Sequence, residues 1–124
     1  MKKNIYEFKY RYHTGTVAWA LHRLSGLALI LYLAMHIWVI HHLDRPLDFN
    51  SVMAFLNEPV FKVLELGLWG VIVYHALNGL RIITVDFFTR KGAAVQKQMF
   101  WATVLLGIVV FAAGAIPFVG HMVK

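Results

Sequence analysis

Two short polar motifs lie inside long apolar segments of this 124-residue chain. Residues 22–26 (HRLSG) open an apolar run that continues to Ile40, and residues 75–81 (HALNGLR) lie late in a second run that stops at Asp86. An arginine at the centre of a membrane helix costs about 2.5–3.5 kcal/mol by insertion scales, so such residues persist mainly where they bind something. Imidazole and guanidinium groups in these surroundings predict a site for haem or quinone.

The second motif supplies the predicted iron ligand, His75. A neutral imidazole in an apolar run needs partners for both ring nitrogens, and imidazole is a standard axial ligand of b-type haem. Gly79 lies four residues later on the same helix face, where a small residue would admit a flat ring. A hydrogen bond to a neighbouring helix explains His75 alone equally well, and a close helix contact also explains Gly79 alone. The combination favours haem.

Two charged residues follow on this segment. Arg81 is nearer the cytoplasmic end, where its guanidinium would neutralise a haem propionate. Taken alone, an arginine in this place is more simply explained by snorkelling to the headgroups. Asp86 and Asn78 share roughly the face of His75, and Asp86 is included among the candidate site residues.

The first motif places three hydrogen-bonding side chains near the start of the first apolar segment. His22, Arg23 and Ser25 can bond a quinone carbonyl or a haem propionate. Gly26 follows one helical turn after His22. The alternative for Arg23 is a charge that sets the topology and snorkels to the surface.

A further histidine, His36, is fourteen residues beyond His22, which is nearly four turns and ~21 Å along a helix. It is a candidate ligand of a second haem, outward of the first. No glycine lies one turn away to admit a ring, so a hydrogen-bonded helix contact is an equal alternative.

The composition indicates an integral membrane protein, because 60% of residues are hydrophobic and 15% are charged, against about 25% charged in soluble domains. Three segments, at about 17–43, 60–88 and 100–119, exceed or match the length of about 20 residues that spans a bilayer. Short links make neighbouring helices antiparallel. We therefore expect an all-α, up-down-up single domain that forms half of a helical bundle. A short surface helix is expected over 52–56, capped from residues 48–51.

The net charge of +6 is concentrated before the first segment and between the second and third. By the positive-inside rule, we expect the N-terminus in the cytoplasm and the C-terminus outside. The membrane is expected to be of the bacterial inner type. No basic groove with interleaved aromatic residues accompanies these charges, so no nucleic-acid partner is expected. The chain has no cysteine, which excludes thiolate-bound iron–sulfur clusters from this subunit.

Together the motifs resemble those of the cytochrome b membrane-anchor subunit of succinate dehydrogenase, in the succinate:quinone oxidoreductase and fumarate reductase family. The resemblance covers nearly the whole chain. It implies that His75 is the axial ligand of haem b, and that His22 and Arg23 lie near its propionates, with Arg23 also in the quinone site. Trp19 stands where the family often has a serine, and Ile82 where it often has a histidine. The quinone pocket is therefore expected to be built differently.

The resemblance also implies partners and cofactors. A flavoprotein subunit with FAD would oxidise succinate, and an iron–sulfur subunit would carry electrons to ubiquinone or menaquinone at the anchor. A second anchor subunit would supply the opposite histidine of the haem. His36 resembles the extra histidines of those forms that hold two haems. The chain itself would not act on succinate.

Three alternatives stay open. The chain could be the cytochrome b subunit of another quinone-linked membrane oxidoreductase. A haem-free transporter would use its buried histidines to relay protons. A structural subunit would use them only as packing contacts. An optical spectrum separates the last two from the redox proteins.

Overall fold

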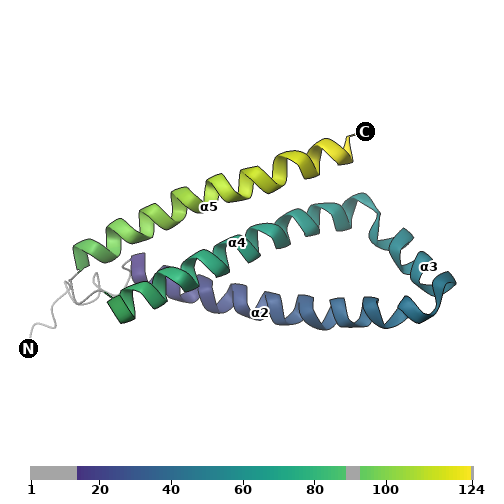
Figure 1. Ribbon diagram of the computed structural model, residues 1–124, viewed down its shortest axis with the longest axis horizontal. Coiled ribbons are helices and arrows are strands. Elements are labelled where there is room, and N and C mark those ends of the chain that lie inside the picture. The colour runs from purple at the N-terminus through teal and green to yellow at the C-terminus, as the bar shows by residue number, and fades with distance from the viewer. Residues whose placement is uncertain (1–13, 89–92, 124) are drawn as a thin grey trace, which may run out of the picture.

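Helices account for nearly all of the chain that the computed structural model describes, residues 14–88 and 93–123 (Figure 1). Their order is α2 (Thr14–Ile40), the short 3₁₀ helix η1 (His41–Asp44), α3 (Pro46–Leu56), α4 (Pro59–Phe88) and α5 (Ala93–Met122). These ranges contain no strand, so the predicted all-α fold class is confirmed. The basic residues at positions 2–11 and 90–91 that indicated the topology fall outside the described ranges.

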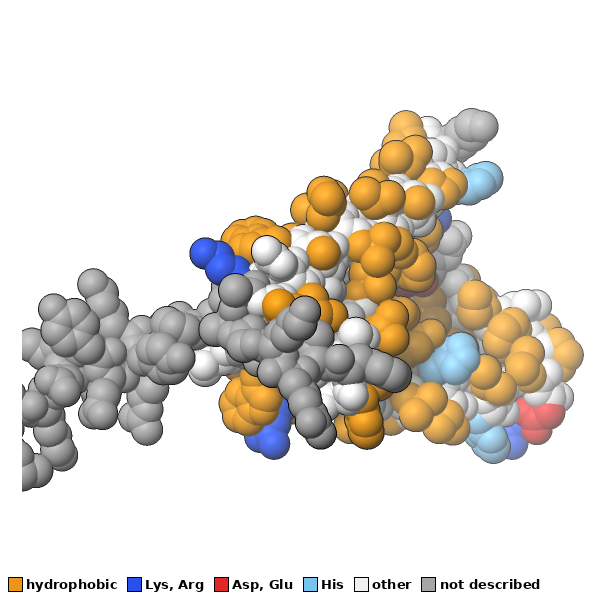
Figure 2. Space-filling model, turned by 60° about the vertical axis from the view of Figure 1, so that its left-hand side comes forward, with side chains coloured by type: hydrophobic (Ala, Val, Ile, Leu, Met, Phe, Trp, Pro, Cys, Tyr) orange, Lys and Arg blue, Asp and Glu red, His pale blue; other side chains and the backbone are white. Residues whose placement is uncertain are grey.

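Three of these helices are long and apolar enough to cross a membrane, over Thr16–Asp44, Pro59–Phe87 and Lys97–Met122. The three predicted spans are confirmed. Within the described residues the buried apolar side chains are only those of Ala18 and Val73, whereas Leu31 and Ile116 are 70% and 72% exposed. Hydrophobic side chains cover most of the face in Figure 2. An apolar surface of this extent is expected of helices that lie in a membrane, because soluble monomers rarely expose so large an apolar area.

Helix α4 lies between α2 and α5, and the three run antiparallel in turn (Figure 1). Helices α2 and α4 come together toward the end where α2 begins, and they diverge toward α3. The Tyr74 hydroxyl on α4 donates to the carbonyl oxygen of Ala18 on α2 at 3.0 Å. This hydrogen bond between the two helices fixes how α2 is rotated and shifted against α4.

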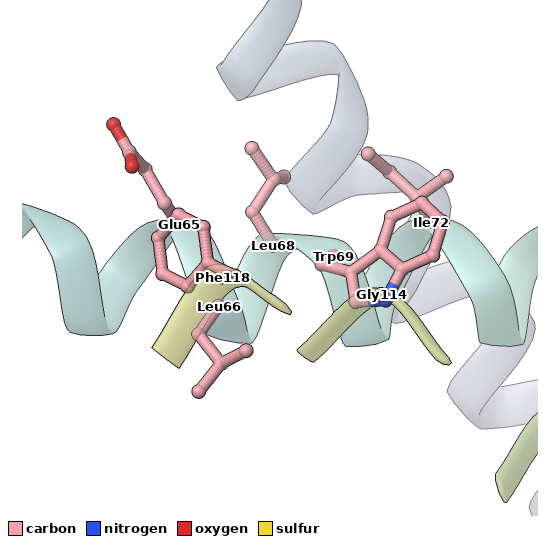
Figure 3. A pocket seen from close by; sticks show the side chains of 7 residues that line it. All are labelled: Glu65, Leu66, Leu68, Trp69, Ile72, Gly114 and Phe118. Carbon is pink, nitrogen blue, oxygen red and sulfur yellow. The ribbon is translucent and has the colours of Figure 1, made fainter. Parts of the chain in front are cut away.

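A tryptophan and a glycine set the contact between α4 and α5. The indole nitrogen of Trp69 donates to the carbonyl oxygen of Phe111 at 3.2 Å. A Cβ atom at Gly114 would lie 2.5 Å from that same nitrogen, so only glycine leaves room for the indole. Figure 3 shows the Trp69 side chain at the Gly114 backbone, beside a cavity of about 340 Å³.

The short helix between the first two spans begins earlier than predicted. Helix α3 starts at Pro46, and its N-cap residue Arg45 makes no side-chain capping bond. The expected cap at 48–51 is wrong, because proline at the first helical position is already preorganised for a helix and lacks an N–H that would need a partner. Asp48 lies in the first turn instead, where a negative charge favours the helix.

The third long helix also begins earlier than its apolar stretch. Helix α5 starts at Ala93 rather than near residue 100. Hydropathy marks only the part of a helix that lies in lipid, whereas alanine, glutamine and lysine are good helix formers that extend it beyond the apolar part. The second span agrees closely with the prediction, and Pro59 opens it.

Candidate functional site

The imidazole rings of His22 on α2 and His75 on α4 stack face to face. Their centroids are 4.1 Å apart and their planes differ by 6°. The stack brings together one histidine from each motif, since α2 and α4 lie close to each other there.

Two glycines make this close approach possible, and they are arranged reciprocally. Gly26 lies one turn after His22 and faces the other ring: a Cβ there would be 3.1 Å from Cε1 of His75. Gly79 lies one turn after His75, and a Cβ there would be 3.3 Å from Cε1 of His22. Each helix therefore presents a histidine and, one turn on, the glycine that admits its neighbour's ring. Gly79 was expected to admit a porphyrin beside His75, and its nearest neighbour here is the His22 ring.

The side chain of Ser25 contacts both histidines. Its side chain is 7% exposed. Its Oγ lies 2.8 Å from the carbonyl oxygen of His22 and 2.9 Å from Nδ1 of His75. The spacing of His22, Ser25 and Gly26 in the first motif thus reflects three different contacts around one pair of rings.

Asn78 is a buried residue beside the histidine pair, and it is not among the site residues predicted from the sequence. It is 1% exposed, and its amide nitrogen donates to the carbonyl oxygen of Ala18 at 3.3 Å. Its Oδ1 accepts a hydrogen bond from Nε of Arg81 at 3.0 Å. Since Tyr74 donates to the same Ala18 carbonyl, one backbone oxygen of α2 holds two side chains of α4. The signal available in the sequence was an asparagine inside an apolar run.

A groove of about 580 Å³ opens beside the stacked rings, on the α2 side. It is lined by His22, Arg23, Gly26, Leu27, Leu29, Ile30, Leu33 and His75. Arg23 is exposed and its guanidinium carbon lies 4.4 Å from the ring centroid of Trp19, one turn earlier on the same helix. Trp19 therefore supports the arginine through a cation–π contact. The groove combines an apolar wall with two imidazoles and one guanidinium.

The other predicted site residues do not line this groove. Arg81 donates to Asn78, and its guanidinium carbon lies 5.7 Å from the ring centroid of Phe100 on α5. Asp86 is exposed near the end of α4. Of the eight predicted residues, three line the groove, namely His22, Arg23 and His75. Ser25 contacts His75, and Gly79 packs against His22.

His36 belongs to a different part of the molecule. It is exposed, and its Nδ1 lies 3.4 Å from the hydroxyl of Tyr32. Both residues line a cavity of about 550 Å³ whose wall also includes Phe49 on α3 and Glu65 on α4. No group of three or more histidine, cysteine or acidic side chains in the described residues could hold a metal ion by itself.

Among the described residues, Nδ1 of His22 is the only buried side-chain nitrogen or oxygen atom that has no hydrogen-bond partner. Buried polar atoms are rarely left unpaired, and the exceptions commonly mark functional positions. The fold and site thus define a three-span membrane protein that carries a histidine pair between its first two spans. Residues 4–116 match the family model described as "Succinate dehydrogenase/Fumarate reductase transmembrane subunit". The chain belongs to this family of membrane-anchor subunits.

Three relatives illustrate the similarity. The succinate dehydrogenase 2 membrane subunit of Mycobacterium tuberculosis is 34% identical over 93 residues, covering 74% of this chain and 68% of the relative. A succinate dehydrogenase hydrophobic membrane anchor subunit of Halobacterium salinarum is 35% identical over 105 residues, covering 82% and 79%. Its counterpart in Archaeoglobus fulgidus is 30% identical over 99 residues, covering 79% and 83%.

Proposed function

We propose that this chain is the haem b-binding anchor subunit of a succinate dehydrogenase and that it helps to pass electrons from an iron–sulfur subunit to quinone. The observation that carries the proposal is the His22–His75 pair beside an open apolar groove, with Ser25 behind His75. A histidine whose Nδ1 meets a protein hydroxyl keeps Nε2 for a metal, which is the usual arrangement of a ligating imidazole.

The residues of the groove fit a haem. His75 would hold the iron through Nε2, and the leucine and isoleucine side chains of α2 would contact the apolar ring. Arg23 would pair with a propionate or a quinone carbonyl, since its guanidinium is exposed at the same groove. When bound, a b-type haem supplies a one-electron carrier whose potential depends on its ligands and their hydrogen bonds.

The stacked geometry also argues that the second iron ligand comes from another chain. A haem held by two histidines of this chain would have to fit between their rings. His22 and His75 lie face to face at 4.1 Å, with no space for a macrocycle between them. His22 therefore would not act as the opposite ligand of the same haem. A second anchor subunit would supply the opposite histidine.

The remaining parts of the proposal follow from membership of the family. The flavoprotein subunit with FAD and the iron–sulfur subunit would dock at the cytoplasmic end, where the N-terminus of this chain would lie in a bacterial-type inner membrane. The electron acceptor would be ubiquinone or menaquinone. The exposed apolar faces of α2 and α5, which include Leu31 and Ile116, would contact lipid and the second anchor subunit.

A second haem at His36 is the one extension that a specific observation favours. His36 and Tyr32 line a cavity of about 550 Å³ toward the opposite end of the bundle. The weak contact of Nδ1 with Tyr32 leaves Nε2 available to a ligand. Two haems per flavin in the purified complex would support this extension, and one would return His36 to a packing role.

The direct experiment adds succinate to membranes that contain the complex and records the reduced-minus-oxidised spectrum. We expect a b-type absorbance that appears with succinate and decays when quinone is added. A complex that reduces quinone with no b-type signal would contradict the haem part of the proposal. A complex with neither property would favour the transporter or structural alternatives.

A further inference from the structure

Ser25 is poorly placed to touch a bound ligand. It is 7% exposed and is not among the residues that line the groove. Its hydroxyl is instead engaged by two atoms of the protein, the carbonyl oxygen of His22 at 2.8 Å and Nδ1 of His75 at 2.9 Å. Any contribution of Ser25 to the site must therefore pass through these two contacts.

The two contacts determine where the protons lie. A backbone carbonyl only accepts, so the single hydroxyl proton of Ser25 is donated to His22. The oxygen of Ser25 is then left as an acceptor toward His75. Both contacts are satisfied only when His75 carries its proton on Nδ1, and the lone pair of the neutral ring is then on Nε2.

The orientation of the ring is fixed by the same neighbours. Ser25 bonds His75 at Nδ1, the His22 ring covers one face, and Gly26 lies against Cε1. These three contacts, at Nδ1, on one ring face and at Cε1, leave the His75 side chain little freedom to rotate. The serine hydroxyl is the only one of these three contacts that distinguishes the two nitrogens of the ring.

From this geometry we infer that Ser25 is a positioning residue, which holds His75 in the tautomer that presents Nε2 to the iron. The inference rests on the proposed haem function. A hydrogen bond accepted from the far nitrogen raises the basicity of a ligating histidine, and loss of such a partner typically weakens metal binding about 10- to 100-fold. Ser25 thus acts on the haem without touching it.

The test compares three variants in the purified complex. Ser25→Ala removes the acceptor with little change in volume. Ser25→Thr keeps a hydroxyl that can still bond the preceding turn of the helix. Ser51→Ala is the matched control, because Ser51 also bonds a backbone carbonyl one turn back but is exposed on α3. Each is assayed for haem per flavin, midpoint potential and the low-temperature EPR spectrum of the ferric haem.

We expect Ser25→Ala to lose haem on washing about 10- to 100-fold more readily than wild type, to shift the EPR spectrum, and to raise the midpoint potential, because a less basic imidazole stabilises ferric iron less. Ser25→Thr should stay close to wild type, and Ser51→Ala should be unchanged.

Three outcomes would overturn the inference: an alanine variant equal to wild type in all three readouts, a threonine variant as impaired as alanine, or loss of the whole chain from the membrane in Ser25→Ala alone. Failure of the proposed function looks different, because the wild-type complex would then contain no b-type haem.

Discussion

Gly26 lies directly against the ring of His75, and a Cβ there would be 3.1 Å from the ring carbon Cε1. Gly79 and His22 show the same relationship with the helices exchanged, because a Cβ at Gly79 would be 3.3 Å from Cε1 of His22. In each case the helix that carries one histidine also carries the glycine that accommodates the other. The site therefore depends on residues of two helices in equal measure, and neither motif is complete without its partner.

The first prediction concerns this contact. Gly26→Ala should gain about 0.5–1 kcal/mol of helix propensity but cost about 1–3 kcal/mol of packing strain, because the His75 ring is held on its other sides. We therefore expect lower thermal stability of the complex and a lower haem content. Gly67→Ala on α4 is the control, since a Cβ there meets nothing within 4 Å. Equal effects of the two substitutions would contradict the contact.

A second prediction concerns the carbonyl of Ala18, which receives hydrogen bonds from Tyr74 and Asn78. Tyr74→Phe removes one bond and should cost about 0.5–1.5 kcal/mol of stability. Asn78→Leu should cost more, about 1–3 kcal/mol, because it also leaves the half-buried Nε of Arg81 without its acceptor. Chemical denaturation in detergent measures both. A Tyr74→Phe variant that is less stable than the Asn78→Leu variant would contradict this ranking.

The α4–α5 contact gives a third prediction. Gly114→Ala would bring a methyl group to 2.5 Å from the indole nitrogen of Trp69 and so displace its bond to Phe111. We expect a loss of about 1–3 kcal/mol in stability, as for other overpacked interiors. Gly120→Ala on the same helix meets nothing within 4 Å and serves as the control. Thermal melting monitored by tryptophan fluorescence compares them, and an unshifted Gly114→Ala melt would argue against the packing.

The fourth prediction separates the quinone role of Arg23 from assembly. Arg23→Leu should impair quinone reduction more than electron transfer to a soluble dye, because the dye takes electrons before the anchor. Trp19→Leu removes the ring 4.4 Å from the guanidinium carbon and should produce a milder form of the same defect, since a cation–π contact is worth about 0.5–2 kcal/mol. Equal loss of both activities in Arg23→Leu would indicate failed assembly instead.

The three spans were predictable from the sequence because long apolar segments with few charges have few other stable structures. The grouping of His75 with His22 and Arg23 was accessible through the resemblance of the two motifs to a known family. Ser25 was predicted as a site residue, and the structure places its hydroxyl between His22 and His75 by contacts that the sequence does not indicate.

The remaining features depend on how one helix is rotated against another, which the periodicity of a single segment does not determine. Arg81 shares a sequence motif with His75, yet it turns toward Asn78 and α5. The reciprocal role of Gly26 and Gly79 appears only when both helices are placed. The start of α3 at Pro46 differs from the prediction, because the polar cluster at 48–51 also has the composition of a helix cap.

The most direct test of the account is the haem content per flavin of the purified complex in His75→Ala and His36→Ala, with the amount of this chain in the membrane measured in parallel. We predict that His75→Ala loses a b-type haem while the chain still inserts, because the other histidine of the groove, His22, has no hydroxyl at its Nδ1 like that of Ser25 at Nδ1 of His75. Full haem content and an unchanged spectrum in His75→Ala would contradict the central claim.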